Sequence, residues 1–176
     1  MISACGHDNS AVITSECKVY VWGSNTSNKL GIKSQNPCEF APKLLEELHS
    51  IEKISLGHNH SAAINTNKEL FTWGHGFFGQ LGHGGTNSIS TPKKVEYMYT
   101  KFHKVKCGYY HTCAIDNKKK IYIWGRKKYN LSSDKDKDKP EPIDEFKNQS
   151  INSIQVGQGF TVFLVCLFQL DKFLLK

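Results

Sequence analysis

The sequence predicts an all-β fold, a partial β-propeller built from about three and a fraction repeats of about 51 residues, each a three- to four-stranded antiparallel blade. Two observations lead to this prediction. A Trp-Gly pair recurs at intervals of 51 residues, and each interval holds short runs of β-branched and aromatic residues bounded by turn residues. Three or four short strands cannot bury both faces of a sheet alone, so each repeat must stack on its neighbours, as propeller blades do around an axis.

Three sets of marker residues recur at 51 residues or within two residues of that spacing. Each full repeat carries a Trp-Gly pair, a second glycine ahead of that pair, and a proline after it. The markers are Trp22, Trp73, Trp124, Gly23, Gly74, Gly125, Gly6, Gly57, Gly108 and Gly157, together with Pro42, Pro92 and Pro142. We expect each tryptophan to be wedged between successive blades. We expect the repeated glycines to lie where the backbone needs a positive φ or a close approach.

The same markers divide the chain into repeats. Three full repeats cover residues 1–51, 52–102 and 103–151, and a partial repeat covers residues 152–164. Residues 165–176 form an atypical C-terminal tail, because they have no turn where the repeat pattern requires one and no Trp-Gly pair follows.

Each full repeat contains three short apolar runs separated by turn residues, and each run is long enough for one strand. The segments just after Pro42 and Pro92 are candidates for a fourth, outer strand, where proline is tolerated. No stretch shows helical periodicity over the roughly 11 residues that would identify a helix. Residues 44–51 are the one short stretch compatible with a helix.

The second and third repeats share an ordered set of motifs, namely Gly-x-x-His-Ser/Thr-x-Ala-Ile and then an aromatic residue shortly before Trp-Gly. The second repeat adds Gly-Gln-Leu-Gly. The matching residues are Gly57, His60, Ser61, Ala63, Ile64, Phe71, Trp73, Gly74 and residues 79–82, and in the third repeat Gly108, His111, Thr112, Ala114, Ile115, Tyr122, Trp124 and Gly125. This combination resembles the repeat of the regulator of chromosome condensation (RCC1) family over roughly residues 3–164. The resemblance implies a seven-bladed β-propeller.

The sequence departs from the family pattern at several positions. Asn9 stands where His60 and His111 stand, and Lys29 stands where Gln80 does. Propellers close with about four to eight blades, and seven blades of this size need roughly 357 residues, about twice the length of this chain. Our hypothesis is therefore that the chain is part of a longer propeller.

His60 and His111 occupy equivalent positions in successive repeats. A catalytic site needs different groups that converge at one place, whereas a repeat distributes identical groups around the axis. No carboxylate accompanies these histidines in register. We therefore expect each ring to bond to neighbouring backbone in its blade, and we favour this interpretation over a metal or acid–base site.

The six cysteines lack the spacing of a metal site. Cys5 and Cys107 directly precede the repeated glycine and Cys113 belongs to the next run, so we expect all three to be small apolar core residues. The glycine-rich segment 76–85 is interpreted as a turn, because no Gly-Lys-Ser/Thr and no helix follow it to form a phosphate cradle. We expect no catalytic residue, no cofactor and no bound metal.

The net charge of +7 is local, because residues 101–150 carry 13 basic and 7 acidic side chains. Of the 23 basic residues 22 are lysine, which is a poor composition for sequence-specific reading of nucleic acid. Two basic clusters flank the run 121–124 and should lie roughly 20 Å apart on opposite rims. These candidate partner contacts are Lys118, Lys119 and Lys120 in one cluster and Arg126, Lys127 and Lys128 in the other. Solvated turn lysines are the default interpretation, and contact of one rim with an acidic partner is the sharper one.

The N-terminus lacks the basic and apolar regions of a signal peptide. The C-terminal apolar run is interrupted by Asp171 and Lys172 and is shorter than the roughly 20 residues that span a bilayer. We expect an intracellular protein, cytoplasmic or nuclear, with reduced thiols, no membrane partner and no small-molecule substrate.

We therefore expect a non-catalytic protein-interaction scaffold with a protein partner such as a small GTPase or a chromatin protein. The alternative that the resemblance implies is guanine-nucleotide exchange on a Ran-like small GTPase, with association to chromatin. In the family that activity uses an inserted β-hairpin. The uniform repeats of 49–51 residues leave no room for it, so such a hairpin would have to lie in blades missing from this chain. The family's plant light sensor is disfavoured, because its Gly-Trp-Arg-His-Thr motif is replaced here by Gly-His-Asn-His-Ser and Gly-Tyr-Tyr-His-Thr.

Overall fold

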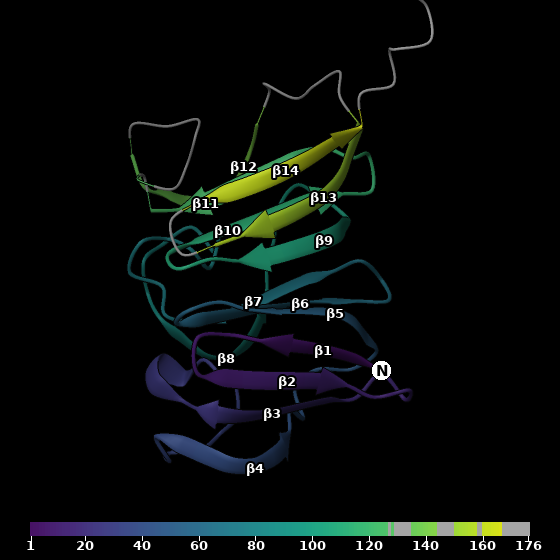
Figure 1. The fold of residues 1–176 in the computed structure, drawn as a ribbon. Coiled ribbons are helices and arrows are strands. Elements are labelled where there is room, and N and C mark those ends of the chain that lie inside the picture. Colours follow the sequence, from purple (N-terminus) through teal and green to yellow (C-terminus); the bar gives the residue numbers. More distant parts are fainter. Residues whose placement is uncertain (127, 129–134, 144–149, 158–159, 167–176) are drawn as a thin grey trace, which may run out of the picture.

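The computed structural model describes residues 1–126, 128, 135–143, 150–157 and 160–166. Three four-stranded antiparallel sheets and one two-stranded sheet follow one another along the chain, which confirms the predicted all-β class (Figure 1). The helical content of the described part is small, and its 3-10 turn η1 spans Thr26–Asn28. No helix there is long and apolar enough to cross a membrane.

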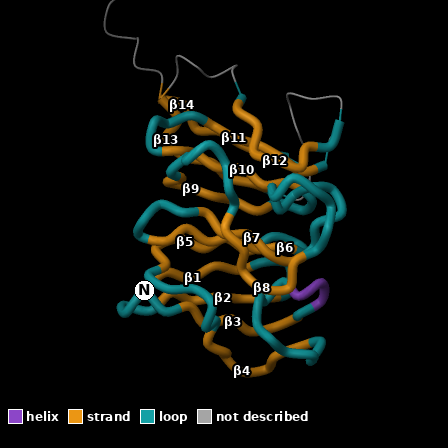
Figure 2. Tube along the Cα trace, turned by 180° about the vertical axis from the view of Figure 1, so that it is seen from behind, coloured by secondary structure: helices purple, strands orange, loops and turns teal. Residues whose placement is uncertain are grey.

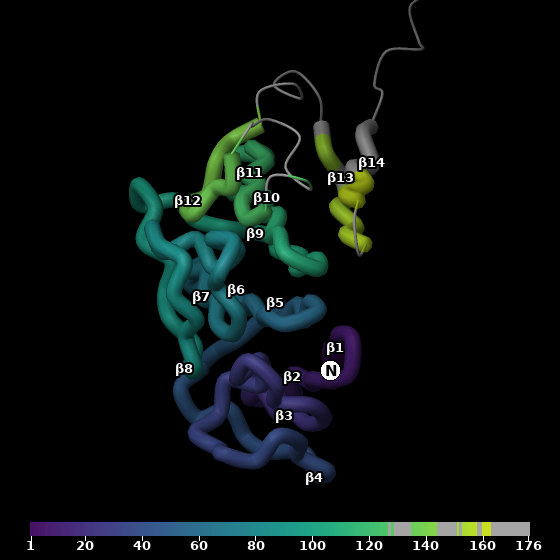
Figure 3. The backbone as a smooth tube through the Cα atoms, turned by 90° about the vertical axis from the view of Figure 1, so that its left-hand side faces the viewer, coloured from purple at the N-terminus to yellow at the C-terminus, as the bar shows by residue number. Residues whose placement is uncertain are grey.

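The strands of each sheet pair in sequence order. The first sheet contains β1 (Ile2–Cys5), β2 (Asn9–Ile13), β3 (Val19–Ser24) and β4 (Cys38–Leu44). The second contains β5 (Ile51–Leu56), β6 (His60–Asn65), β7 (Leu70–Gly74) and β8 (Ile89–Lys94), and the third contains β9 (Phe102–Cys107), β10 (His111–Asp116), β11 (Ile121–Gly125) and β12 (Lys137–Pro142). The last sheet contains β13 (Ser150–Val156) and β14 (Thr161–Cys166). When the molecule is turned by 90° about the vertical axis of Figure 1, the sheets are seen to fan out as an arc, with β1, β5, β9 and β13 innermost (Figure 3). This is the arrangement of propeller blades.

The register of pairing repeats from sheet to sheet. Trp22, Trp73 and Trp124 face Ser10, Ser61 and Thr112 respectively on the neighbouring strand. In all three sheets, the pairing of the third and fourth strands shifts register at the Trp-Gly pair. The sequence period therefore corresponds to a repeated unit of three-dimensional structure.

The glycine of each Trp-Gly pair adopts the positive φ that the sequence predicts. The φ angles are 98° at Gly23, 102° at Gly74 and 107° at Gly125. A residue with a side chain would be strained at this φ, which explains the glycine. The same position coincides with the register shift, where the strand accommodates the extra twist of a bulge.

The other repeated glycine allows two sheets to approach closely. A Cβ on Gly57 would lie 2.5 Å from the carbonyl oxygen of Gly108, and a Cβ on Gly6 would lie 2.8 Å from that of Gly57. The chain also bonds across this seam, because the amide of His7 donates to Gly57 O at 3.3 Å and that of His58 donates to Gly108 O at 3.2 Å. The expected close approach is thus confirmed.

Burial of the tryptophans depends on the preceding sheet. Trp73 and Trp124 are fully buried in the core clusters between successive sheets, as predicted. The same expectation is wrong for Trp22, which is half-buried. Trp73 packs against Gly31 of the first sheet, and Trp124 against Gly82 of the second, whereas no described sheet precedes the one that carries Trp22.

The burial of the cysteine before the repeated glycine also depends on whether another sheet precedes its own. Cys107 and Cys113 are buried, as expected, but Cys5 is exposed, which corrects the prediction for that residue. The Cβ of Cys107 lies close to Gly57 of the preceding sheet. Cys5 has no such neighbour, because no described sheet lies on that side of β1.

Two further expectations need correction. Residues 44–51 form no helix; the stretch runs from the end of β4 through a turn to the start of β5, and the turn buries Leu45 and Leu48. The prolines lie within the outer strands β4, β8 and β12 rather than ahead of them. An outermost strand tolerates proline because it needs no amide donor on its free edge.

The chain after the third sheet is described in part. β14 reaches Cys166, slightly beyond the predicted end of the partial repeat at residue 164. Residues 167–176, most of the predicted tail, lie outside the described residues.

The variant Trp73→Ala is expected to lower the free energy of unfolding by about 3–5 kcal/mol, as truncation of a large aromatic side chain in a core does. The variant Trp22→Ala removes the same side chain from a half-buried site, so its cost is expected to be clearly smaller. Urea denaturation followed by circular dichroism measures both values. Equal losses for the two variants would contradict the stacking order of the sheets.

Candidate partner-binding rims

The turns and loops gather on two sides of the stacked sheets (Figure 2). We call one side the first rim; it carries the turns between the first and second strands of each sheet and the long β3–β4 and β7–β8 loops, on the left in Figure 1. The second rim carries the turns between the second and third strands and the connections from one sheet to the next. These rims are where candidate partner contacts lie, because the interior of each sheet is buried.

Main-chain carbonyls hold successive sheets together beneath the first rim. Lys29 O accepts hydrogen bonds from Ser61 Oγ at 2.7 Å and from Trp73 Nε1 at 2.9 Å. In the next pair of sheets, Gln80 O accepts a hydrogen bond from Thr112 Oγ1 at 2.8 Å. Each of these bonds runs from one sheet to the loop of the sheet before it, so the loops cannot move independently of the blades.

The repeated histidines complete this link between sheets. His60 Nε2 lies 2.8 Å from Thr112 Oγ1 in the following sheet, and His111 Nε2 lies 2.9 Å from Thr161 Oγ1. The single hydroxyl proton of Thr112 is donated to Gln80 O, so the hydroxyl must accept from His60, and this network assigns the ring proton of His60 to Nε2. The expectation of a bond to neighbouring backbone in the same blade is therefore corrected to a hydroxyl of the next sheet.

Burial keeps both rings neutral. Desolvation, followed by the neighbouring His111, lowers the pKa of His60 from 6.5 to about 3, and desolvation lowers the pKa of His111 to about 4. Within the described residues no three His, Cys, Asp or Glu side chains are grouped so as to hold a metal ion. These histidines therefore act as hydrogen-bonding side chains that join sheets.

Lys29 is buried in the position that Gln80 takes one repeat later. Its ammonium group donates to the carboxylate of Asp8 and to His58 O, which lies 3.1 Å away. The buried charge is thus paired with a carboxylate, which is what burial of an ammonium group requires. Asp8 therefore compensates for the lysine that stands here in place of the glutamine of the second repeat.

A continuous row of rings crosses the first rim, and we call it the aromatic band. It consists of His7, His58, Tyr109, Tyr110, Phe78, His75 and Phe77, with the guanidinium group of Arg126 above it. Its members come from the β1–β2, β5–β6 and β9–β10 turns and from the β7–β8 loop. Three sheets therefore contribute to one surface.

The inner part of the aromatic band follows the repeat. The ring centroids of His7 and His58 are 4.2 Å apart, and those of His58 and Tyr109 are 3.8 Å apart in a stacked arrangement. Each of these residues directly follows the repeated glycine. A hollow of about 310 Å³ lies beside them, lined also by Cys5 and the backbone of the glycines.

The outer part of the aromatic band depends on the β7–β8 loop. Tyr110 and Phe78 are 4.7 Å apart, and Arg126 lies 4.7 Å above the centroid of Phe78 and 5.4 Å from that of Tyr110. Phe77 is 67% exposed. The band therefore ends in the exposed ring of Phe77, which contacts His75, while the cation of Arg126 faces Phe78 and Tyr110.

The buried side chain of Gln80 positions this outer part. Its Oε1 accepts the amide of Phe78 at 2.9 Å, and its Nε2 donates to His75 Nδ1 at 2.7 Å. The Gly-Gln-Leu-Gly motif thus fixes both a main-chain turn and a ring. Sequence reasoning recognised this motif but missed Phe77, Phe78 and Tyr110. Phe77 and Phe78 lie in a loop without a repeat marker, and Tyr110 takes a repeat position that holds Asp8 and Asn59 in the other repeats.

The predicted basic clusters lie at opposite ends of β11, as expected. Lys118, Lys119 and Lys120 are exposed in the β10–β11 turn on the second rim, whereas Arg126 follows β11 on the first. Lys128 is also exposed, and Lys127 lies outside the described residues. Arg126 differs from a solvated turn residue, because it is half-buried against the aromatic band.

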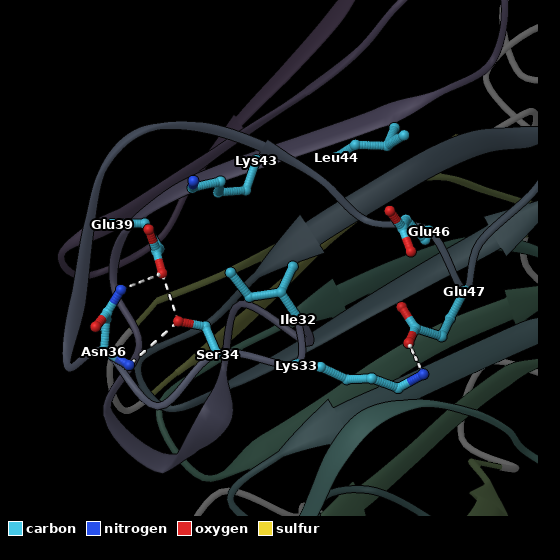
Figure 4. Close-up of a pocket in the computed structure, with 9 residues that line it drawn as sticks. All are labelled: Ile32, Lys33, Ser34, Asn36, Glu39, Lys43, Leu44, Glu46 and Glu47. Carbon is cyan, nitrogen blue, oxygen red and sulfur yellow. Dashed lines mark hydrogen bonds and ion pairs between the residues drawn. The ribbon is translucent and has the colours of Figure 1, made fainter.

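Beside β4 lies a hollow of about 390 Å³ with several charged side chains (Figure 4). Glu39 accepts hydrogen bonds from Ser34 Oγ and from Asn36 Nδ2, which lies 3.2 Å away, and Lys33 pairs with Glu47 at 3.0 Å. The bond from Ser34 lowers the pKa of Glu39, so this carboxylate is held ionised. These groups organise the β3–β4 loop and are already paired with one another.

Comparison with known proteins identifies the repeat. A sequence model of the regulator of chromosome condensation (RCC1) repeat matches residues 18–64 and 68–115, and a second model of the same repeat matches residues 51–80 and 102–130. The chain belongs to this family. The family that the sequence motifs indicated is thereby confirmed.

Relatives of this RCC1-repeat chain include much longer proteins. The human E3 ubiquitin-protein ligase HERC2 is 33% identical over 128 residues, which are 70% of this chain and 3% of HERC2. The mitochondrial RCC1 domain-containing protein RUG3 of Arabidopsis thaliana is 35% identical over 126 residues, 70% of this chain and 28% of RUG3. The chain therefore spans only a small part of these relatives.

The fold is shared with a solved RCC1-type structure. Prp20p of Saccharomyces cerevisiae superposes with a TM-score of 0.82 at 21% identity, covering 93% of this chain and 43% of Prp20p. Within the described residues every strand belongs to one of the four sheets. Exchange activity on a small GTPase therefore stays a prediction from the family resemblance.

The stability of the fold is expected to fall as the pH falls from about 6.5 towards 4. Below pH 6.5 the unfolded chain binds protons at His60 and His111 that the folded chain does not, because their folded pKa values are about 3 and about 4. Between pH 7 and pH 5 the loss should be on the order of 1–2 kcal/mol for each histidine. Urea denaturation at a series of pH values measures it.

The variant His60→Asn provides the control, since Asn9 occupies the equivalent position of the first repeat. This variant should be less stable at pH 7 but should lose less additional stability between pH 7 and pH 5. An unchanged pH slope in the variant would show that His60 is protonated in the folded state, contrary to the structure.

Proposed function

We propose that this chain is a non-catalytic protein-interaction scaffold, and that a protein partner binds it through the aromatic band on the first rim. The observation that carries this proposal is the arrangement of Arg126 over Phe78 and Tyr110, continued by the exposed ring of Phe77. Aromatic residues and arginine are the types that concentrate binding energy at protein interfaces. Here they lie together on one surface.

The rigidity of the aromatic band supports this role. The band rests on turns of three sheets, and those sheets are joined by the bonds of Lys29 O, Gln80 O and His60. Gln80 also fixes the outer rings from below. A surface that is already ordered loses little conformational entropy on binding, so more of the contact energy contributes to affinity.

The extent of the aromatic band favours a protein over a small ligand. Its rings run from His7 in the first sheet to Arg126 after the third, and its outer end is exposed rather than enclosed. Small ligands prefer concave sites that bury most of their surface. Prp20p, which shares the fold, is described as binding the proteins Gsp1p and histones, and this is consistent with a protein partner here.

Photo-crosslinking in cells tests the proposal on the full-length protein. A benzoyl-phenylalanine at position 77 is expected to give a crosslinked protein that the same residue at position 40 does not. Phe40 is the matched control, because it is 95% exposed but lies on β4, away from the aromatic band.

The double variant Phe77→Ser with Arg126→Ala should then weaken binding of the purified crosslinked partner by about tenfold or more, the loss expected from removing interface residues worth more than about 1 kcal/mol. Phe40→Ser should leave the affinity unchanged. Isothermal titration calorimetry measures both. Crosslinks confined to position 40, or an unchanged affinity in the double variant, would contradict the proposal.

A further inference from the structure

A second surface lies on the opposite rim of the third sheet, between the β8–β9 connection and the β10–β11 turn. It is a hollow of about 570 Å³ whose lining includes Met98, Tyr99, Lys101, Lys118 and Lys120. We call this surface, defined by those five residues, the lysine hollow. All five side chains are exposed, with Met98 at 80% and Tyr99 fully exposed.

We propose that the lysine hollow binds an acidic segment of a protein partner, with Met98 and Tyr99 contacting an apolar side chain of that segment. This site is separate from the aromatic band, because it lies on the other rim and carries a different chemistry. The proposal therefore does not depend on the function proposed for the first rim.

Comparison with the second sheet shows that two carboxylates of its second rim have no acidic counterpart beside the lysine hollow. In the second sheet, Lys68 contacts both carboxylate oxygens of Glu52 at 2.7 Å, and Lys94 pairs with Glu69 at 2.9 Å. One repeat later, the positions of Glu52 and Glu69 are taken by His103 and Lys120. Both carboxylates that neutralise lysines on the second rim are thus replaced.

The carboxylate that remains in the lining of the lysine hollow is already engaged. Asp116 is buried; its Oδ1 accepts the amides of Lys118 and Lys120, each at 2.8 Å, and its Oδ2 accepts the hydroxyl of Tyr122 at 3.1 Å. Among the described residues, no salt bridge joins Lys101, Lys118 or Lys120 to a carboxylate, although Lys101 interacts electrostatically with Glu69. Asp116 therefore fixes the shape of the turn, and a bound partner would supply the missing negative charge.

The apolar tip of the lysine hollow is held in an unusual backbone conformation. Met98 and Tyr99 have φ angles of 44° and 55°, a left-handed region that side chains rarely occupy, and they do so in succession. The loop is anchored on either side, because Tyr97 packs against Tyr122 with centroids 5.7 Å apart and Thr100 donates to Tyr97 O at 2.8 Å. Strain of this kind persists where the surroundings enforce it, and it often marks functional surfaces.

The residue types in the lysine hollow favour a protein segment over nucleic acid. Its cations are all lysines, which attract carboxylates as compact charges but lack the bidentate fork with which arginine reads base edges. Methionine is common on surfaces that bind varied protein side chains, and tyrosine is enriched in protein interfaces. A segment of glutamates or aspartates with one apolar residue matches both halves of the hollow.

Fluorescence anisotropy with a labelled probe tests this proposal. The probe is a fluorescein-labelled peptide of glutamates with one central leucine, measured at physiological salt to limit non-specific attraction. The double variant Lys118→Glu with Lys120→Glu should weaken binding by about tenfold or more, since charge reversal replaces attraction by repulsion. The matched control is Lys43→Glu with Lys53→Glu, which changes the net charge equally at exposed positions outside the hollow and should leave the affinity within about twofold.

A second pair of measurements separates a built site from general charge attraction. The variant Met98→Ser with Tyr99→Ser should weaken binding of the leucine-containing peptide but not of an all-glutamate peptide. Equal effects of the two lysine variants would overturn the proposal, as would tighter binding of a single-stranded oligonucleotide than of the peptide. Unchanged circular dichroism melting confirms that the exposed substitutions leave the fold intact, and the aromatic-band variants should bind the peptide normally.

Discussion

The hydrogen bonds that reach from one sheet to a main-chain carbonyl of the preceding sheet are the interaction on which this architecture depends. A propeller sheet buries its two faces only if its neighbours keep a fixed distance and orientation. The bonds to Lys29 O and Gln80 O, together with that from His60 to Thr112, set both. The acceptor at positions 29 and 80 is the main-chain carbonyl, so these hydrogen bonds do not depend on the side chain of the residue. A lysine can therefore replace glutamine while the hydrogen bond between the sheets is kept.

The arrangement of the sheets could be predicted from the sequence, because the regular spacing of the Trp-Gly pairs shows that each repeat forms the same unit. The environment of a given copy could not be predicted in the same way. Trp22 and Cys5 share their repeat positions with buried residues but are less buried, because burial is conferred by the preceding sheet and not by the repeat itself. The partner of His60 was missed for a related reason, since the hydroxyl of Thr112 comes from the next repeat.

The candidate surfaces show a similar division. The positions of the basic clusters at opposite ends of one strand followed directly from the sequence. The aromatic band did not, because Phe77 and Phe78 come from a loop without a repeat marker and meet Tyr110 only in three dimensions. The role of Lys120 also depended on the structure. It takes the repeat position of Glu69, which pairs with Lys94 in the second sheet, and only the structure shows that it lines a hollow together with other lysines. Departures from the repeat thus account for the outer part of the aromatic band and for the lysine hollow. The repeat itself accounts for the inner part of the band and for the framework between the rims.

The prolines in the outermost strands have a consequence for how copies of the protein meet one another in a crowded solution. The free edge of a sheet is a template on which a strand of another molecule can add, which is one route to aggregation. Pro42, Pro92 and Pro142 each remove one amide donor from such an edge, in β4, β8 and β12. These three edges are therefore poor templates for intermolecular pairing, which leaves the side chains of the two rims as the surfaces for specific contact.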